Sequence, residues 1–439
     1  MNKEIFKMNN NISSLVRSIL FISIPMIISN ISIPLLGLID TAIVGRIGTI
    51  EIGSVAIGAA TFSLIYWSFS FLRMCTTGFV AQSWGGRKEK EVEEILQKTI
   101  SIAIFCGILI ILLLIPLRNL CLLLLGPSEE IKLIAIEYIN IRIWGAPAVF
   151  MNFVIMGILI GSNKPWNVLV ITLFTNLINI ILDFYLGVFL AYEVKGIAYG
   201  TLIAEWSGII LGLIIIKKTF PKFQIFNINI KLNTILKRII SSNINFFIRT
   251  ILLLVSIMMF TAIGARLGDL VLAVNAILIL LQMFLSYGLD GFAQAAEVLV
   301  GNSYGSKNKI LFKKVTILTG LISFIAALAY SLIYLFYGLS IIKIITNINE
   351  VIIAAEIYLP WIALSPVISF LSFHLDGVFI GASKTKIMRN SMIFSFLIYI
   401  SAIIILVPMY QNHGLWASFL IFMFFRGLTL LVRYKSLVI

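Results

Sequence analysis

The chain has 439 residues, of which 60% are hydrophobic and only 12% are charged, with a formal net charge of +14. This balance excludes a soluble protein and predicts a polytopic α-helical membrane protein, because a lipid-spanning chain must satisfy its backbone hydrogen bonds within helices or closed barrels, and the period-2 alternation of a barrel is missing. The three cysteines are too widely spaced for a disulfide framework or a metal site, and the two histidines lie far apart in sequence.

The first long apolar run, Leu15 to Asp40, predicts a membrane-spanning helix with two special residues. Pro25 lies inside the run, where a proline removes a backbone hydrogen bond and permits a bend. Asp40 closes it, and an Asp near the middle of a membrane costs about 2.5–3.5 kcal/mol on insertion scales. We therefore expect a bendable helix that carries a functional carboxylate near its end. The alternative is a hydrated Asp40 at the outer interface.

Eleven further apolar runs follow, so we predict twelve membrane spans. Their approximate ranges are 15–40, 52–82, 96–118, 132–161, 166–190, 196–216, 237–264, 271–302, 312–337, 350–381, 387–409 and 413–433.

Lysine and arginine fall mostly in the loops on one side of these spans, for example at Arg87-Lys88, Lys217-Lys218 and Lys313-Lys314. The positive-inside rule then places both termini in the cytoplasm. The basic charge is an orientation signal and a partner for anionic lipids, and we expect no nucleic-acid partner. The longest polar connection predicts an N-terminal lobe over 1–216, a cytoplasmic linker over 217–236 and a C-terminal lobe over 237–439.

The two halves repeat with a shift of 220 residues. Three segments match their counterparts: Gly45–Gly48 with Ala265–Gly268, Ala81–Gly85 with Gly301–Gly305, and Gly157–Lys164 with Gly377–Lys384. Because six spans separate equivalent positions, both repeats have the same orientation and should be related by an axis along the membrane normal. This arrangement is typical of transporters built from two bundles, and channels also repeat in this way.

Polar residues of the first half gather on a few helical faces. Asn176, Asn179 and Asp183 are spaced i, i+3 and i+7, and Thr201 lies one turn before Glu205. Asp40, Asn179, Asp183 and Thr201 together offer the oxygen ligands that a proton relay or a Na⁺ ion needs. The structural alternative, in which the Asn and Thr side chains only bond between helices, stays open at this point.

The second half does not repeat these acids, since Phe260 stands at the position of Asp40 and Ile403 at that of Asp183. It carries other acids instead, in the predicted eighth and tenth spans: Asp290, Glu297 and Asp376. These acids, with Asn176, are the candidates for a substrate cleft. Arg249 and Arg426 are possible partners for them, as Arg73 and Arg142 are in the first half, so a purely structural ion pair is the alternative.

Several motifs resemble those of the multidrug and toxic compound extrusion (MATE) transporters, in their DinF-like branch. They are Gly37–Gly45 with the letters GLIDTAIVG, Phe71–Gly78 with FLRMCTTG, Leu289–Ala293 with LDGFA, and Asp376–Ala382 with DGVFIGA followed by Met388–Met392 with MRNSM. They are spread over both halves, so the resemblance covers essentially the whole chain, and their combination is specific where any one alone is not.

The resemblance implies twelve helices in two pseudo-symmetric six-helix lobes around a central cleft, and efflux of organic cations in exchange for H⁺ or Na⁺. It implies a cation-coupling site at Asp40, Asn179, Asp183 and Thr201 in the first lobe, with Pro25 as the bending point. Beyond the coupling ion no cofactor is implied, and we expect a monomer in the inner membrane of a bacterium. Leu36 departs from relatives that carry a tyrosine near this site.

Three rival functions remain. A flippase of a lipid-linked or amphipathic substrate on the same fold would carry more cationic residues in its cavity. A membrane-embedded enzyme would need a metal-binding acidic cluster or a nucleophile–base pair, and neither is found in the sequence. A channel would tend to show a selectivity-filter sequence or pore-lining polar rings, and none is apparent.

Overall fold

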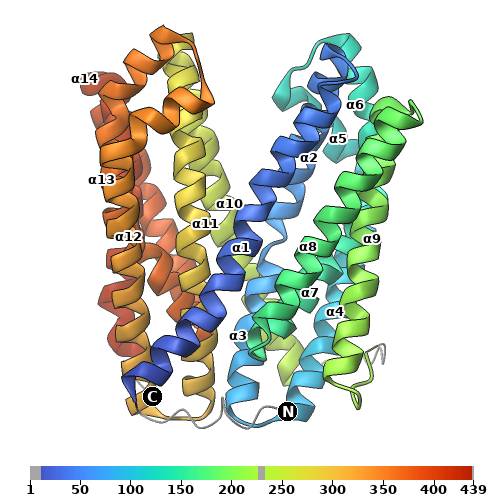
Figure 1. The fold of residues 1–439 in the computed structure, drawn as a ribbon. Coiled ribbons are helices and arrows are strands. Elements are labelled where there is room, and N and C mark those ends of the chain that lie inside the picture. Colours follow the sequence, from blue (N-terminus) through green and yellow to red (C-terminus); the bar gives the residue numbers. More distant parts are fainter. Residues whose placement is uncertain (1–10, 226–232, 438–439) are drawn as a thin grey trace. The chain divides into compact units, whose positions relative to one another are not determined.

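The computed structural model describes residues 11–225 and 233–437, and these residues are almost entirely helical, with no strand (Figure 1). The helices are α1 Ile12–Val44, α2 Thr49–Ser68, α3 Phe71–Gly85, α4 Glu89–Leu112, α5 Leu114–Leu125, α6 Glu129–Arg142, α7 Ala146–Gly161, α8 Pro165–Leu182, α9 Glu193–Thr219, α10 Thr234–Arg266, α11 Asp269–Gly305, α12 Lys309–Ile345, α13 Asn349–Gly381 and α14 Thr385–Arg433. Short segments of other helical types are η1 Ile143–Gly145, η2 Asp183–Phe189 and η3 Tyr434–Leu437.

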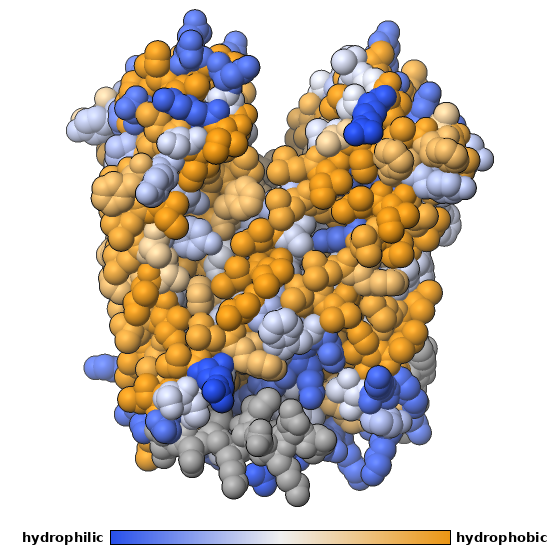
Figure 2. Space-filling model, in the orientation of Figure 1, coloured by the Kyte–Doolittle hydropathy of each residue, from blue (hydrophilic) through white to orange (hydrophobic). Residues whose placement is uncertain are grey.

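Eleven stretches of the described chain are long and apolar enough to cross a membrane. The last of them, Thr385–Leu437, contains a break at Gln411, where the backbone leaves the helical region (φ 48°, ψ −124°). The break falls between the predicted spans 387–409 and 413–433, so the twelve predicted spans are accounted for. Figure 2 shows apolar side chains along the helices and hydrophilic ones gathered mainly towards the helix ends.

The predicted third span, 96–118, is wrong at its end. Helix α4 stops at Leu112, and the separate helix α5 begins at Leu114. Pro116 explains the break, because a proline cannot donate to the carbonyl four residues earlier and its ring clashes with that carbonyl. The equivalent helix of the second half, α12, has no proline there and runs unbroken to Ile345.

The 220-residue repeat predicted from the sequence is present in the backbone. Helices begin at equivalent residues in the two halves: Thr49 and Asp269, Glu89 and Lys309, Glu129 and Asn349, Pro165 and Thr385. Non-glycine residues with positive φ also form equivalent pairs: Arg87 (58°) and Lys307 (57°), Asn163 (61°) and Ser383 (53°), Ala191 (54°) and Gln411 (48°). Because this conformation is uncommon for residues with a Cβ, its recurrence in one register shows that the two halves share their turns as well as their helices.

Two glycines of each half bring helices together at equivalent points. In the first half, a Cβ at Gly157 or Gly161 would press on the backbone carbonyl of Arg73 or Thr77, at 2.9 and 2.8 Å. In the second half, Gly377 and Gly381 meet the carbonyls of Ala293 and Glu297, the residues 220 positions later. The motif Gly-x-x-x-Gly thus packs α7 on α3 and α13 on α11 in the same way, as small residues do between membrane helices.

The described chain packs into two compact units. Unit 1 comprises Met1–Asn30, Trp84–Arg87 and Ser241–Ile439, and unit 2 comprises Ile31–Ser83 and Lys88–Ile240. Helix α1 therefore contributes to both: the Asn30 amide donates to the carbonyl of Tyr287 (3.3 Å) in unit 1, and the remainder of α1 packs in unit 2. The division of the chain at 217–236 stays a prediction, and residues 226–232 of that linker lie outside the described residues.

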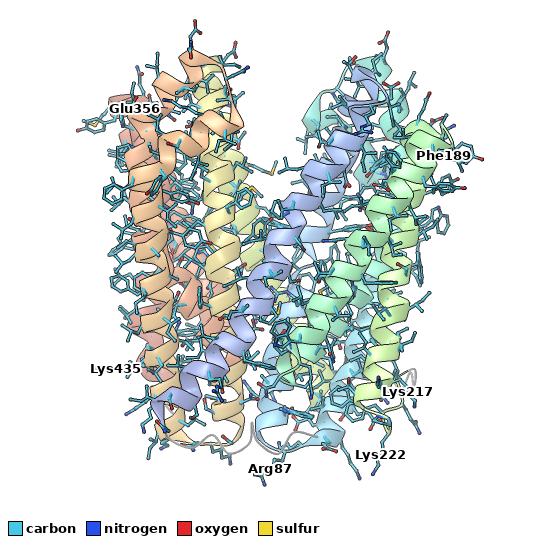
Figure 3. The ribbon with its side chains drawn as sticks, viewed as in Figure 1. Arg87, Phe189, Lys217, Lys222, Glu356 and Lys435 are labelled. Atoms are coloured by element: carbon cyan, nitrogen blue, oxygen red, sulfur yellow. The ribbon has the colours of Figure 1, made fainter. Side chains whose placement is uncertain are left out.

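Labelled residues mark the two ends of each unit. In unit 2, Lys217 and Lys222 lie at the end opposite to Phe189 (Figure 3). In unit 1, Arg87 and Lys435 lie at the end opposite to Glu356 (Figure 3). In unit 2 these basic residues lie at the end where α7 finishes. In unit 1 they lie at the end where its equivalent, α13, finishes.

Candidate functional site

Asp183 is the most deeply buried acid of unit 2, with 0% of its surface exposed. It follows α8 and opens η2, a seven-residue π-helical segment, and such segments occur often at functional sites. Both of its carboxylate oxygens are buried without a hydrogen-bond partner of good geometry. On the facing helix α9, a Cβ at Gly200 would collide with Oδ1 of Asp183, so only a glycine leaves room for the carboxylate.

Asn179 and Thr201 lie beside this carboxylate, as the sequence predicted. The Asn179 amide nitrogen donates to the Thr201 hydroxyl (3.1 Å), which in turn donates to the carbonyl of Ile197 (3.0 Å). This chain of donors fixes the orientation of the amide. The remaining amide oxygen, Oδ1 of Asn179, is buried without a partner, so it joins the two oxygens of Asp183 as an unused acceptor.

Asp40 completes the predicted set from α1. It is half-buried, and its Oδ1 atom is buried without a hydrogen-bond partner. Asp40 and Asp183 interact electrostatically, and each also interacts with Arg142. The structure therefore brings the four predicted cation-coupling residues of unit 2 into one cluster.

Two other predicted residues of the first half have distinct places. The Asn176 amide donates to the Ser32 hydroxyl (3.1 Å) and so ties α8 to the later part of α1. Pro25 lies in the earlier part of α1, where the backbone of Ser23 and Ile27 approaches Gly291 of α11 so closely that a Cβ at Gly291 would be 3.0 Å from the Ile27 nitrogen. Helix α1 is continuous through Pro25.

An ion pair next to the cluster was not predicted as a pair. Arg142, at the end of α6, donates to Oε1 of Glu205 on α9 (2.7 Å) and to the hydroxyl of Tyr138 (3.2 Å). Its guanidinium lies 4.8 Å from the ring centre of Phe62. The sequence signal was present, since Arg142 and Glu205 are charged residues inside apolar spans. The sequence does not show how each helix is rotated about its own axis, however, so it does not show that these two side chains face each other.

Asp376 in unit 1 has a very different environment. Its Oδ2 atom accepts hydrogen bonds from both Arg249 of α10 and Arg426 of α14, the latter at 2.8 Å. All three side chains are largely buried, with 5% of each arginine and 12% of the aspartate exposed. The structure thus supports the ion-pair interpretation of Asp376, with both suspected arginines as partners.

The other two candidates of the second half lie on α11. Glu297 is buried, and its backbone carbonyl lies at the Gly381 contact. Asp290 is half-buried and interacts electrostatically with Arg426 and Tyr287. A role of Asp290, Glu297 or Asp376 in a substrate cleft stays a prediction.

The donor set of unit 2 suits a proton or a hard monovalent cation. Carboxylate, amide and hydroxyl oxygens are ligands of hard cations, and a carboxylate also takes up a proton. No group of three or more His, Cys, Asp or Glu side chains able to hold a metal ion occurs among the residues that the structure describes.

Comparisons with known proteins agree with this architecture. The family model described as MatE matches residues 25–185 and 246–405. DNA damage-inducible protein F of Escherichia coli (strain K12) is 35% identical over 412 residues, which cover 93% of this chain and 90% of that protein. The probable multidrug resistance protein NorM of Acinetobacter baylyi (strain ATCC 33305 / BD413 / ADP1) is 26% identical over 299 residues, covering 66% of each chain.

Solved structures match along almost the whole length. A crystal structure of MATE in the bent conformation has a TM-score of 0.87 at 20% identity and covers 96% of both chains. An outward-facing multidrug resistance MATE transporter of the MOP superfamily has a TM-score of 0.86 at 19% identity, again covering 96% of both. With the family model matching both repeats, the chain belongs to the MatE family, as a DinF-like MATE transporter of the multi-pass membrane type, and is not an enzyme.

Proposed function

We propose that this transporter is a secondary active antiporter that exports organic cations in exchange for H⁺ or Na⁺ by alternating access. The observation that carries the proposal is the buried carboxylate of Asp183, which accepts no hydrogen bond of good geometry and lies beside the unused oxygen of Asn179. An unpaired charge inside a membrane is costly, so this site gains most from an entering cation. Asp40 adds a second acid to the same site.

The exchange would begin when an external cation enters the cluster of Asp40, Asn179, Asp183 and Thr201. Neutralising the two carboxylates lowers the cost of excluding water from the site, which favours a more closed arrangement of α1 against α8. Because Pro25 leaves α1 without one backbone hydrogen bond, α1 bends there at low cost. The bend would shrink the outward-open cavity and displace the substrate to the outside.

The driving force is sufficient in scale. One elementary charge moving through 100 mV supplies about 2.3 kcal/mol. A cation shifts the equilibrium between the straight and bent states of α1 only if it binds one state more tightly than the other. The cluster must therefore bind the cation more tightly in the bent state. A difference of about 1.4 kcal/mol changes the ratio of the two states tenfold.

The membrane topology is part of the proposal. Both termini would lie in the cytoplasm of a bacterial cell, with the basic ends of the helices facing anionic lipids. External cations would then reach Asp40 and Asp183 from the end of unit 2 that is opposite to Lys217 and Lys222. We propose a monomer as the functional form.

Counterflow of a fluorescent organic cation in proteoliposomes, under separately imposed pH and Na⁺ gradients, tests this function. Acceleration by one gradient identifies the coupling ion. No response to either gradient, together with movement of a fluorescent lipid between leaflets, would instead establish a flippase on the same fold.

A further inference from the structure

The ion pair of Arg142 and Glu205 lies beside the cation site but has no part in the exchange described so far. Arg142 is the last residue of α6, and the 3₁₀ segment η1 follows it in the middle of a membrane span. Such a segment often marks a hinge. Gly145 of η1 leaves space for Glu205, because a Cβ at this position would collide with Oε2 of Glu205. The fold therefore contains a place made for this carboxylate.

The pair is incompletely satisfied for a buried ion pair. The guanidinium uses one nitrogen for Glu205 and one for Tyr138, while its Nε atom is buried without a partner. Oε2 of Glu205 is likewise buried without a partner. Buried charges that keep unused donors and acceptors are costly to maintain, so a purely stabilising role explains this pair poorly.

Three carboxylates interact with this one guanidinium. Arg142 interacts electrostatically with Asp40 and Asp183 as well as with Glu205. The other titratable groups that face the pair are Tyr66 of α2, whose hydroxyl is buried without a partner, and Tyr138 of α6. Tyr138 also interacts with Asp40 and Asp183, and Glu205 follows Thr201 of the cation site by one turn of α9, so the pair is next to the cation site.

We propose that Arg142 is an internal counter-ion that Glu205 and the Asp40–Asp183 site share in turn. When the site is empty, the guanidinium compensates the aspartates. When a proton or Na⁺ neutralises them, it returns to Glu205, the carboxylate that it contacts in this structure. Glu205 thus withdraws the competing positive charge and sets how tightly the site holds its cation. This inference rests on the proposed function and adds a positioning pair to it.

The exchange uses the side chain of Arg142. Arginine has a long, flexible side chain, and its planar donor group can form equivalent bonds to any carboxylate within reach. The stacking of the guanidinium on Phe62 does not depend on the identity of the carboxylate. The hydroxyl of Tyr138, which interacts with both aspartates, accepts a second hydrogen bond from the guanidinium.

Glu205→Gln is the direct test, because it removes the charge of residue 205 and keeps a hydrogen-bond acceptor for Arg142. The measured quantity is the proton or Na⁺ concentration at the midpoint of the cation-induced change in melting temperature of the purified full-length protein. We expect the midpoint to rise about tenfold, since Arg142 then stays near the aspartates and competes with the cation. Glu137→Gln is the matched control, because Glu137 forms an exposed pair with Lys195 (3.3 Å) in the same unit, and its midpoint should stay native.

Arg142→Gln should change the midpoint in the opposite direction, to a cation concentration about tenfold lower. If this variant does not fold because Glu205 is left unpaired, the double variant Arg142→Gln/Glu205→Gln replaces it, and its midpoint should lie below that of Glu205→Gln alone. A native midpoint in a folded Glu205→Gln protein, or an equal midpoint in the single and double Gln variants, would overturn the proposal.

The same titration separates this inference from the proposed function. Asp40→Asn/Asp183→Asn should abolish the cation response if the site acts as proposed. Loss of the response in this variant together with a native Glu205→Gln midpoint would overturn the counter-ion role alone. Persistence of the response in this variant would overturn the proposed cation site, and with it the inference.

Discussion

Asp183 and Asp376 are both carboxylates inside membrane spans, yet their surroundings differ completely. Asp376 accepts hydrogen bonds from two buried arginines, whereas Asp183 is fully buried with no donor of good geometry on either oxygen. The insertion cost of the two residues is similar, so cost alone does not separate a structural acid from a functional one. The hydrogen-bonded partners do: an acid that is hydrogen-bonded to resident cations stabilises its unit, and an acid that is not has room for a transported cation.

The contrast extends to the two repeats. They share helix starts, positive-φ turns and glycine contacts in one 220-residue register. Their charges are not shared, since Phe260 and Ile403, which replace Asp40 and Asp183, are buried in the hydrophobic core of unit 1. A duplicated scaffold thus carries two different sets of polar residues.

The largest expected effect on stability concerns Asp376, the acid that is hydrogen-bonded to two buried arginines. Asp376→Asn removes the anion from two buried arginines, and breaking a buried ion pair in this way costs about 3–5 kcal/mol of stability. Denaturant unfolding in detergent measures the loss. Glu129→Gln, which breaks an exposed pair with Lys132, is the control and should cost less than about 1 kcal/mol. Equal stabilities of the two variants would remove the structural role from Asp376.

Asp183→Asn should give the opposite combination. The variant keeps its fold and its stability, because no cation is hydrogen-bonded to Asp183 and the guanidinium of Arg142 keeps its bond to Glu205. Cation-driven transport falls to the background, since an amide neither takes up a proton nor attracts a cation by charge. Transport assays in proteoliposomes and unfolding of the same preparation check both halves of this expectation. A marked loss of stability with transport intact would assign Asp183 to the scaffold.

Gly200→Ala tests the space that unit 2 reserves for the unpaired acid. The new Cβ would collide with Oδ1 of Asp183, and overpacking of this kind costs about 1–3 kcal/mol. Gly212→Ala on the same helix is the matched control, because its Cβ meets only side-chain atoms of Ile155, at 3.2 Å, and of Ile171. Melting temperatures should fall for the first variant and change little for the second. Equal effects would mean that the approach at Gly200 has no special role.

The smallest expected effect is that of Thr201→Val. It removes the hydroxyl that accepts from Asn179, and hydrogen bonds between membrane helices contribute about 0.6 kcal/mol on average. We expect a small loss of stability and a cation midpoint raised about two- to tenfold, because the Asn179 amide loses its orientation. Thr261→Val is the control, since its hydroxyl donates only within α10 (3.3 Å) in unit 1. A midpoint that is unchanged in Thr201→Val would exclude Asn179 orientation as a factor.

Much of the fold was predictable because apolar run length, basic loops and a repeated register are one-dimensional signals. The twelve spans and the repeat follow from them, whereas the early end of α4 was missed because the apolar run continues past it, through Pro116 in the first turn of α5. The cluster of Asp40, Asn179, Asp183 and Thr201 came from residue spacing and from the family resemblance.

The partners of charged residues were not predictable in the same way. Arg142 and Glu205 lie 63 positions apart in sequence, and Arg249 and Asp376 lie 127 apart. Nothing along the chain shows which helical faces meet over such separations. For the same reason the sequence could not show that Asp376 is paired and Asp183 is not, which is the observation that distinguishes the two acids.

Gradient-driven accumulation of a fluorescent organic cation by Asp183→Asn, compared with its counterflow without any gradient, tests whether Asp183 couples cation entry to transport. Proteoliposomes of the native protein and of the variant are assayed in both modes, with Glu137→Gln as the reference for an unrelated loss of charge. The account predicts that an imposed pH or Na⁺ gradient drives accumulation by the native protein and by Glu137→Gln, but not by Asp183→Asn. Accumulation by Asp183→Asn at the native rate would contradict it.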